Sequence, residues 1–453
     1  MAKRIMSSRL LSLRPISSSS STLNNNPTRL LLLPSTTVSP NLLTFKTSTT
    51  AAAAATDDPT ETKPKKKKKS SKKKAREAEA IKQQQVKEKR RTRSDKEYDD
   101  SHFPRLLEDN EDHVPVMLPE VLDVFASMSL RSFVDCTLGA AGHSSAVIKA
   151  HPELQCYVGM DVDPVAHAKA GPRLDDAISC ANNPNLRAHL VLKNFRHLSS
   201  SIHDLHPGLS HSGVDAILMD LGMSSMQVNN PERGFSVIAN GPLDMRMDPQ
   251  ASLTAQEILN SWPDSEVGRI LRDYGEESNW YLLQNKIVQA RLRGGLNSTS
   301  ELRDLIENLT RRTRGGRQGW IKTATRVFQA LRIAVNDELG TLEKSIHSCF
   351  TCLAPGGRLA IISFHSLEDR IVKQAFLNII GRGDGDGEES SGYMEGSSKI
   401  RGDNGPKDAW IRQIVQGRNG TILTKRPVTP SEEEERLNRR SRSAKLRVIE
   451  KLR

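Results

Sequence analysis

The chain of 453 residues lacks long apolar runs and contains few cysteines and aromatic residues. No apolar segment approaches the ~20 residues needed to span a bilayer, so we expect no membrane partner. The five cysteines are odd in number and scattered, which is typical of reduced thiols and unlike a secreted disulfide framework. Cys349 and Cys352 form the only CxxC pair, with no second pair to complete four ligands, so we expect no metal site.

Excess positive charge is missing from most of the chain, although the formal net charge is +12. Residues 1–105 carry 24 Lys and Arg against 10 Asp and Glu, whereas residues 106–453 carry 42 against 44. The globular part is therefore nearly neutral. Binding to nucleic acid must be argued from local basic patches and not from the charge of the whole chain.

Acidic residues are absent from residues 1–56, which contain six basic residues and are rich in Ser, Thr and Ala. This composition is typical of an organelle transit peptide. Its Ser- and Thr-rich middle favours the chloroplast, with the mitochondrion as the alternative. Residues 57–105 contain the lysine runs 65–69 and 72–74 and are expected to be a basic, disordered linker.

Four segments with the apolar pattern of buried strands each end in small, acidic or aromatic residues. Residues 132–137 lead into Leu138-Gly-Ala-Ala-Gly-His143, and residues 157–161 end in Asp161. Residues 189–193 precede Phe195, and residues 214–220 end in Asp220. Because ligands bind beyond the carboxyl ends of parallel strands, the pattern predicts one ligand site at the edge of a Rossmann-like α/β sheet.

The residues at these strand ends favour S-adenosylmethionine over a dinucleotide. The first turn lacks the full G-x-G-x-x-G of pyrophosphate sites. Asp161 is suited to accept two ribose hydroxyls, and Phe195 to lie against an adenine ring. Asp220 would place a carboxylate near a cationic, amine-bearing ligand. An NAD-binding fold would share the acid after its second strand, so Asp161 alone does not decide between the two.

Strand patterns stop after Asp248, and helical patterns follow. Ser298-x-x-Glu301 is a capping-box pattern, and the leucines and isoleucine after it recur at i, i+3, i+4 and i+7. Residues 249–312 are therefore expected to form an all-helical insertion that selects the substrate. Residues 381–408 are rich in Gly and acids without periodicity and are expected to be a flexible loop.

A basic run without acids lies between Asn308 and Asn336, with Trp320 and Phe328 interleaved. On a helical wheel its polar residues face away from the apolar ones, which is typical of an amphipathic helix with a solvated face. The absence of acids in a nearly neutral domain favours a second interpretation, a face that binds RNA phosphates. The basic residues are Arg311, Arg312, Arg314, Arg317, Lys322, Arg326 and Arg332.

The chain resembles one enzyme family through five long motifs that occur in order. The resemblance is to the MraW/RsmH family, S-adenosylmethionine-dependent N4-cytosine methyltransferases of small-subunit ribosomal RNA. It covers about residues 113–450 and includes the tail motif Ser441-Arg-Ser-Ala-Lys-Leu-Arg447. The five motifs are Asp220-Leu-Gly-Met-Ser-Ser-Met-Gln227, Glu232-Arg-Gly-Phe-Ser236, Gly241-Pro-Leu-Asp-Met-Arg-Met-Asp248, Arg326-Val-Phe-Gln-Ala-Leu-Arg332 and Ser363-Phe-His-Ser-Leu-Glu-Asp-Arg370.

The resemblance implies a Rossmann-like class I methyltransferase sheet formed by residues 106–248 and 313–453, with residues 249–312 as an all-helical substrate-recognition subdomain. It leaves a homodimer open. Three positions depart from the family pattern, namely Ala141 for glycine, and Met226 and Arg439 for proline. The implied cofactor-binding residues are Gly139, Ala141, Gly142, His143, Asp161, Phe195, Asp220 and Gln227, and the predicted RNA-binding residues are Arg246, Arg317, Lys322, Arg326 and Arg332.

Methylation of cytosine N4 requires hydrogen-bond acceptors that hold a poorly nucleophilic amine in line with the methyl group. Asp220 is the predicted catalytic acceptor, with Ser224 and Ser225 positioning the base. A carbon-5 methylase would need a cysteine nucleophile, and none lies between residues 180 and 349. Two alternatives remain at this point, a nonenzymatic ribosome-assembly factor with the same fold and a small-molecule methyltransferase.

Overall fold

The computed structural model describes residues 92–96, 115–310, 316–381 and 414–452, with the side chains of residues 316–318 excepted. The predicted transit peptide, most of the predicted linker and nearly all of the predicted loop 381–408 lie outside the described residues. Among the described helices, none is long and apolar enough to cross a membrane.

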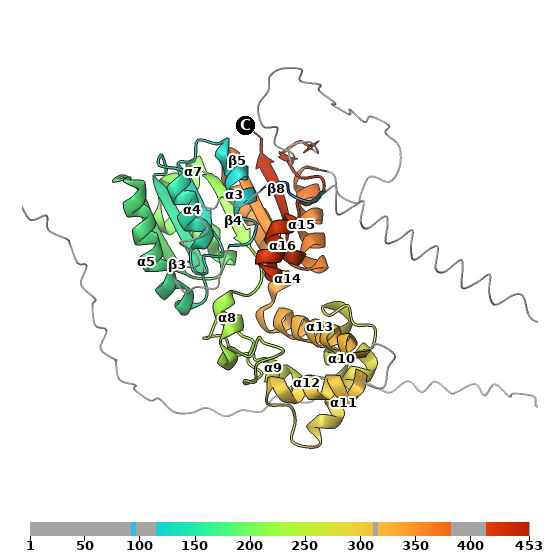
Figure 1. Ribbon diagram of the computed structural model, residues 1–453. Helices are drawn as coiled ribbons and strands as arrows, with labels where there is room; N and C mark the ends of the chain where they lie inside the picture. Colours follow the sequence, from blue (N-terminus) through green and yellow to red (C-terminus); the bar gives the residue numbers. More distant parts are fainter. Residues whose placement is uncertain (1–91, 97–114, 311–315, 382–413, 453) are drawn as a thin grey trace, which may run out of the picture. The chain divides into compact units, whose positions relative to one another are not determined.

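The core of the described chain is an eight-stranded sheet with the order β3-β2-β1-β4-β5-β8-β7-β6 (Figure 1). Strands β1 to β5 are parallel, and β8 pairs with β5 in the antiparallel sense. The predicted α/β fold class is thereby confirmed. The strands are β1 (Ser132–Asp135), β2 (Cys156–Asp161), β3 (Arg187–Leu192), β4 (Val214–Asp220), β5 (Leu353–Ser363), β6 (Val415–Gln416), β7 (Gly420–Ile422) and β8 (Lys445–Lys451).

The parallel register brings the chemically informative strand ends to one edge of the sheet. Asp161 ends β2 opposite Leu192 of β3, and Asp220 ends β4 opposite Ile362 of β5. The buried, apolar residues of β4 explain its central position, because a strand covered on both faces needs apolar side chains on both. The chain can therefore gather ligand-binding groups beyond the carboxyl ends of these strands.

The last strand of the chain, β8, does not lie at the edge of the sheet. Strand β8 pairs with β5 on one side and with β7 on the other, so β6 forms the edge. Strands β6 and β7 have two and three residues, and alternation over so few residues gives no detectable sequence pattern.

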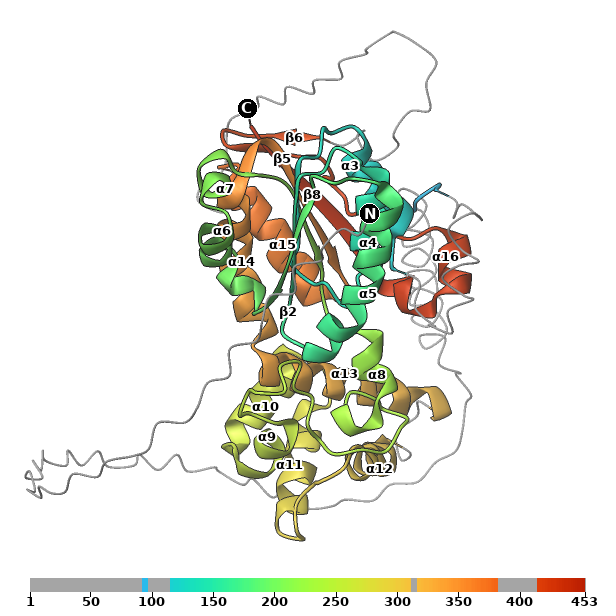
Figure 2. The same cartoon turned by 90° about the vertical axis from the view of Figure 1, so that its left-hand side faces the viewer.

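Helices cover both faces of the sheet (Figure 2). One face packs against α3 (Leu118–Ala126), α4 (Gly142–Ala150) and α5 (Pro164–Ala181). The other packs against α6 (Leu198–Leu205), α14 (Glu338–Cys352) and α15 (Ser366–Ile379), with α7 (Pro207–Ser212) beside α6. Two apolar cores therefore hold the strands rigid, so that their carboxyl ends can position a site.

A third apolar core lies among the helices of the insertion, which gather apart from the sheet in Figure 1. Ser298 and Glu301 form the predicted capping box at the start of α12. The predicted boundary at residue 312 does not match this core, because apolar residues from Phe235 to Val335 pack within it. Its helices are α9 (Ala255–Ser261), α10 (Asp264–Asp273), α11 (Trp280–Arg291), α12 (Thr299–Thr310) and α13 (Gly316–Asn336).

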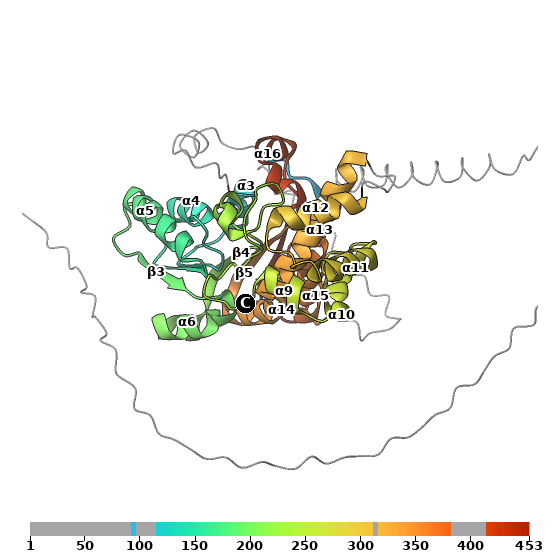
Figure 3. The ribbon, with the colours of Figure 1, turned by 90° about the horizontal axis from the view of Figure 1, so that it is seen from below.

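Residues 92–96 differ from the disordered linker predicted for them, because they pair with the C-terminal part of the chain. Ser94 donates its N–H to the Thr429 carbonyl, and Thr429 donates to the Thr92 carbonyl, both at 2.8 Å. The Arg93 guanidinium forms ion pairs with Glu432 at 2.6 Å and with Glu435 at 2.8 Å, both on α16 (Glu432–Leu437). Figure 3 shows this short blue segment beside α16.

Candidate active site

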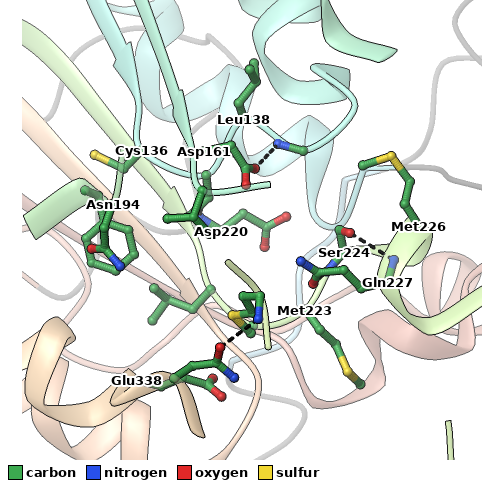
Figure 4. A pocket seen from close by; sticks show the side chains of 18 of the residues that line it. Cys136, Leu138, Asp161, Asn194, Asp220, Met223, Ser224, Met226, Gln227 and Glu338 are labelled. Atoms are coloured by element: carbon green, nitrogen blue, oxygen red, sulfur yellow. Dashed lines mark hydrogen bonds between the residues drawn. The ribbon is translucent and has the colours of Figure 1, made fainter. Parts of the chain in front are cut away.

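A cavity of about 950 Å³ lies beyond the carboxyl ends of β1, β2, β3 and β4 (Figure 4). The turn after each of these strands contributes to its wall, and the junction of α13 and α14 contributes from the helical insertion. All predicted cofactor-binding and catalytic residues except Ala141 line this cavity. These are Gly139, Gly142, His143, Asp161, Phe195, Asp220, Ser224, Ser225 and Gln227.

The turn after β1 depends on backbone conformations that favour glycine. Gly139 has φ +50° and opens to the cavity, and a Cβ at Gly142 would lie 2.5 Å from the Pro115 ring. Ala141 is fully buried behind the cavity wall and has φ 61° at the N-terminus of α4. A positive φ costs an L-residue about 1–2 kcal/mol. The departure from glycine at this position is therefore accommodated with backbone strain.

Asp161 is fixed by backbone donors and still faces the cavity. Its Oδ2 accepts the Gly139 N–H at 2.9 Å, and its Oδ1 accepts the Asp163 N–H at 2.9 Å. Burial raises the pKa of Asp161, whereas these two hydrogen bonds act in the opposite direction. Each carboxylate oxygen has a second lone pair, so the group can still accept hydroxyl donors from a ligand.

The Gln227 side chain forms hydrogen bonds with other residues of the protein. Its Oε1 accepts the Ser224 N–H at 3.0 Å, and its Nε2 donates to Asp163 Oδ2 at 3.1 Å. Asp163 also accepts the Arg233 guanidinium at 2.7 Å, so one buried carboxylate links the turn after β2 to the loop after β4. Asp163 precedes Pro164 as the N-cap of α5, a pattern that could have located it, whereas no sequence pattern relates it to Gln227.

Among the predicted site residues, Asp220 has the most negatively charged neighbours. Its Oδ1 is buried without a hydrogen-bond partner within the described chain, and Oδ2 lies 3.7 Å from His143 Nδ1. Burial and the negative charges of Asp135, Glu368 and Glu434 raise its pKa well above the usual range. The site therefore contains a buried carboxylate to which a cationic ligand would be complementary.

His143 does not supply that positive charge. Its Nε2 lies 2.9 Å from the Val116 carbonyl, which requires the proton to be on this nitrogen. Burial lowers the pKa of His143 to about 4, so the ring is neutral near pH 7.

Sequence reasoning missed a buried ion pair at the junction of α13 and α14. Arg332 Nε and Nη2 donate to the two oxygens of Glu338 at 2.8 and 2.9 Å. Glu338 lines the cavity, where Figure 4 places it across the open space from Asp161. Burial raises the pKa of Glu338, although Arg332 opposes the shift. Asn336 holds the same junction through its contacts with Met245 and Met247.

Glu368 lines the same wall and starts α15 as part of a capping box with His365. Its Oε2 accepts the Phe364 N–H at 2.7 Å. Burial alone would raise the pKa of Glu368, but His365 and then Arg332 outweigh it and lower the pKa. His365 is thus a helix-capping histidine.

The two predicted catalytic serines have partners within the protein. Ser224 caps α8 (Ser225–Asn229), and its Oγ accepts the Gln227 N–H at 3.2 Å. Ser225 Oγ accepts a hydrogen bond from the Arg440 guanidinium, which also donates to Asn229 Oδ1 at 2.8 Å. Arg440 lines the cavity and was missed, because no local pattern relates it to a loop 215 residues away.

The predicted RNA-binding residues divide into two groups. Lys322 and Arg326 lie exposed on α13, and Arg326 makes a contact of 3.5 Å with Glu277. Arg246 is instead occupied by Asp244 and by the carbonyls of Pro249 and Ala251, and Arg332 is buried against Glu338. These two guanidinium groups hold loops and helices together, so they do not match the prediction. The side chain of Arg317 lies outside the described residues.

A cysteine does line the cavity, although none lies in the sequence near Asp220. Cys136 follows β1 and is buried. The neighbouring Cys349 thiol and burial raise the pKa of Cys136 well above its usual range. The thiol form is therefore favoured over the nucleophilic thiolate, which disfavours carbon-5 methylation on chemical grounds.

The sequence matches the MraW methylase family over residues 110–382 and 399–452. The chain belongs to this family. It is 41% identical over 341 residues to ribosomal RNA small subunit methyltransferase H of Heliobacterium modesticaldum, covering 75% of this chain and 99% of that protein. The methyltransferase H of Protochlamydia amoebophila is 40% identical over 342 residues, covering 75% of this chain and 97% of its own length. Membership in the MraW methylase family confirms the predicted methyltransferase activity and S-adenosylmethionine as the cofactor.

The residues present fit this cofactor. Asp161 keeps acceptor capacity for ribose hydroxyls, and the backbone at Gly139 allows close approach of a ligand. The negative charge of the Asp220 carboxylate at the cavity wall is complementary to the cationic sulfonium.

Proposed function

We propose that this MraW-family methyltransferase methylates the N4 amine of a cytosine in organellar small-subunit ribosomal RNA. The observation that carries the proposal is the partly buried Asp220 carboxylate at the end of β4, which lines the cavity and has one oxygen, Oδ1, without a hydrogen-bond partner in the described chain. The names of the relatives support ribosomal RNA as the substrate.

S-adenosylmethionine supplies an electrophilic methyl group on a positively charged sulfur. Asp161 would hold its ribose, and Phe195 would lie against its adenine. Asp220 would attract its positive charge, and the negative charges of Asp135, Glu368 and Glu434, which raise the pKa of Asp220, would act in the same direction.

The cytosine amine would be held mainly by acceptors of the chain. Asp220, Leu221 and Gly222 line the same wall, and the Asp220 carboxylate and the backbone carbonyls of the other two would accept the two amine hydrogens. Ser224 and Ser225 would act by fixing this loop, since Gln227 and Arg440 already occupy their hydroxyls. Catalysis would thus rest on positioning the amine in line with the methyl group.

Two further features support RNA and an organelle. Lys322 and Arg326 project from α13 as exposed cations on the insertion that borders the cavity. Residues 1–56 have the acid-free, Ser- and Thr-rich composition of a transit peptide, which favours the chloroplast over the mitochondrion. A flipped or single-stranded cytosine would enter the cavity most readily.

The test compares organellar small-subunit ribosomal RNA from lines with and without the gene. Loss of N4-methylcytidine at one position, restored by the wild-type chain and not by Asp220→Asn, supports the proposal. An assembly factor without activity predicts restoration by both chains. A small-molecule methyltransferase predicts unchanged ribosomal RNA in the mutant line.

A further inference from the structure

The guanidinium of Arg440 lies at the mouth of the cavity and comes from the C-terminal tail. It donates to Ser225 and Asn229 at the two ends of α8, and its side chain remains exposed. Only two of the five guanidinium N–H donors have acceptors within the described chain. The remaining donors are available to a ligand.

Three arginines near the loop that follows Asp220 have a carboxylate as counter-charge, whereas Arg440 has none among the described residues. Arg233 pairs with Asp163 at 2.7 Å, Arg246 with Asp244 at 2.7 Å and Arg332 with Glu338 at 2.8 Å. Both partners of Arg440 are neutral oxygens, and no carboxylate of the described residues lies within 4.0 Å of it. A cation held in place without an anion is complementary to an anionic ligand.

The position of Arg440 is fixed by its own turn. The Asn438 side chain accepts the Arg440 N–H at 3.0 Å, and the buried Ser441 donates its hydroxyl to the Asn438 carbonyl at 2.8 Å. The contacts to α8 then aim the guanidinium across the loop that follows Asp220. Little side-chain entropy is left to lose when a ligand binds, which increases the value of the contact.

We propose that Arg440 binds a backbone phosphate of the RNA next to the nucleotide that enters the cavity. This inference rests on the proposed function and adds a contact that fixes where the strand crosses the cavity mouth. A phosphodiester is favoured over the carboxylate of the cofactor because Arg440 is exposed at the rim, whereas Asp161 and Asp220 lie at the wall formed by the strand ends. Phosphate contacts of arginine position a nucleic acid without reading its sequence.

The test uses the full-length protein with Arg440→Gln and Arg440→Lys. Arg418→Gln is the matched control, since Arg418 is also an exposed arginine but lies in the turn before β7, at the opposite end of the sheet. Binding is measured by fluorescence anisotropy with labelled small-subunit ribosomal RNA transcript, between about 50 and 200 mM salt. Cofactor binding is measured by calorimetry, and kcat and KM with small subunits from the mutant line.

We expect Arg440→Gln to weaken RNA binding about five- to tenfold at the low end of this salt range, because a charge-assisted hydrogen bond is lost. The slope of log K against log salt should fall by about one, since one phosphate contact is removed. Arg440→Lys should retain the slope, and both variants should bind the cofactor as the wild type does. The control should change neither quantity.

Three outcomes would overturn the inference. Equal effects of Arg440→Gln and Arg418→Gln would mean that Arg440 contacts no phosphate. Weaker cofactor binding with unchanged RNA binding would assign Arg440 to the carboxylate of the cofactor. A lower kcat with an unchanged salt slope would make Arg440 a positioning residue for α8. Failure of the proposed function is seen separately, as a wild type that binds the RNA without methylating it.

Discussion

Asp220→Asn should have opposite effects on the stability of the cofactor-free protein and on cofactor binding. Asp220 Oδ1 is a buried acceptor without a partner in the described chain, and such a group costs about 1–3 kcal/mol. Asparagine keeps the shape and removes the charge that Asp135, Glu368 and Glu434 oppose. An asparagine amide would be unpartnered at this position as well, so the gain comes from the removed charge. We therefore expect the free energy of unfolding at pH 7 to rise by about 1.4 kcal/mol for each pH unit by which the pKa of Asp220 is raised, up to pH 7.

The pH dependence follows from the direction of the pKa shift. The folded protein holds the Asp220 proton more tightly than the unfolded chain, whose aspartate has the ordinary value of 3.8. Wild-type stability therefore contains a contribution that declines as pH rises from 3.8 to the raised pKa of the folded state. Asp220→Asn removes this contribution.

Cofactor binding should change in the other direction. A cation favours the charged carboxylate, so wild-type affinity should rise with pH by up to about tenfold per pH unit and level off above the raised pKa. Binding below that pKa should release a proton. Asp220→Asn should lose about 1.5–3 kcal/mol of binding free energy, which is about 10- to 150-fold in affinity, and the pH dependence with it.

Chemical denaturation without cofactor measures the first effect, and calorimetry in two buffers of different ionisation enthalpy measures affinity and proton release. Asp176→Asn on the exposed face of α5 is the control and should change neither. A cofactor-free Asp220→Asn protein that is less stable than the wild type at pH 7 would refute the reasoning, and so would wild-type affinity that neither rises with pH nor is accompanied by proton release at any pH above 3.8.

Three other changes test the site and its surroundings. Arg332→Met leaves the buried Glu338 carboxylate without a counter-charge, so the free energy of unfolding should fall by about 3–5 kcal/mol. The further change Glu338→Leu should restore most of this free energy, as measured by chemical denaturation. The double change Lys322→Gln and Arg326→Gln should lower the slope of log K against log salt for RNA binding by up to about two. The free energy of unfolding should change by no more than about 0.5 kcal/mol. An unchanged slope would mean that α13 does not contact the RNA. Ala141→Gly relieves a φ of 61° worth about 1–2 kcal/mol, loses a buried methyl worth about 0.8 kcal/mol and adds about 0.4–1 kcal/mol of entropy to the unfolded chain. These terms nearly cancel, so the free energy of unfolding should change by less than about 1 kcal/mol, and a larger loss in thermal unfolding would contradict the strain.

The parallel strands could be predicted because each carries a continuous apolar run that ends in a polar residue. The predicted strand at residues 214–220 coincides with β4, and Asp161, Phe195 and Asp220 meet at one cavity as the strand ends indicated. Strands β6 and β7 could not be found, since two and three residues carry no periodicity.

The roles of individual cations depended on contacts that no local pattern contains. Arg332 and Arg246 lie in basic or polar sequence, yet each is committed to a carboxylate inside the protein. Arg440 stands in an exposed, arginine-rich tail and reaches the cavity only because the chain folds back over α8. Charge in the sequence shows where a phosphate could bind, and counter-ions in the structure show which cations remain for it.

The most direct test of the proposed activity is mass spectrometry of small-subunit ribosomal RNA purified from chloroplasts, and separately from mitochondria, of a line lacking this chain. We predict that N4-methylcytidine disappears from one position of the chloroplast RNA and that the wild-type chain restores it. N4-methylcytidine at unchanged levels in both organelles would contradict the proposed reaction, and its loss from mitochondria alone would contradict the proposed compartment.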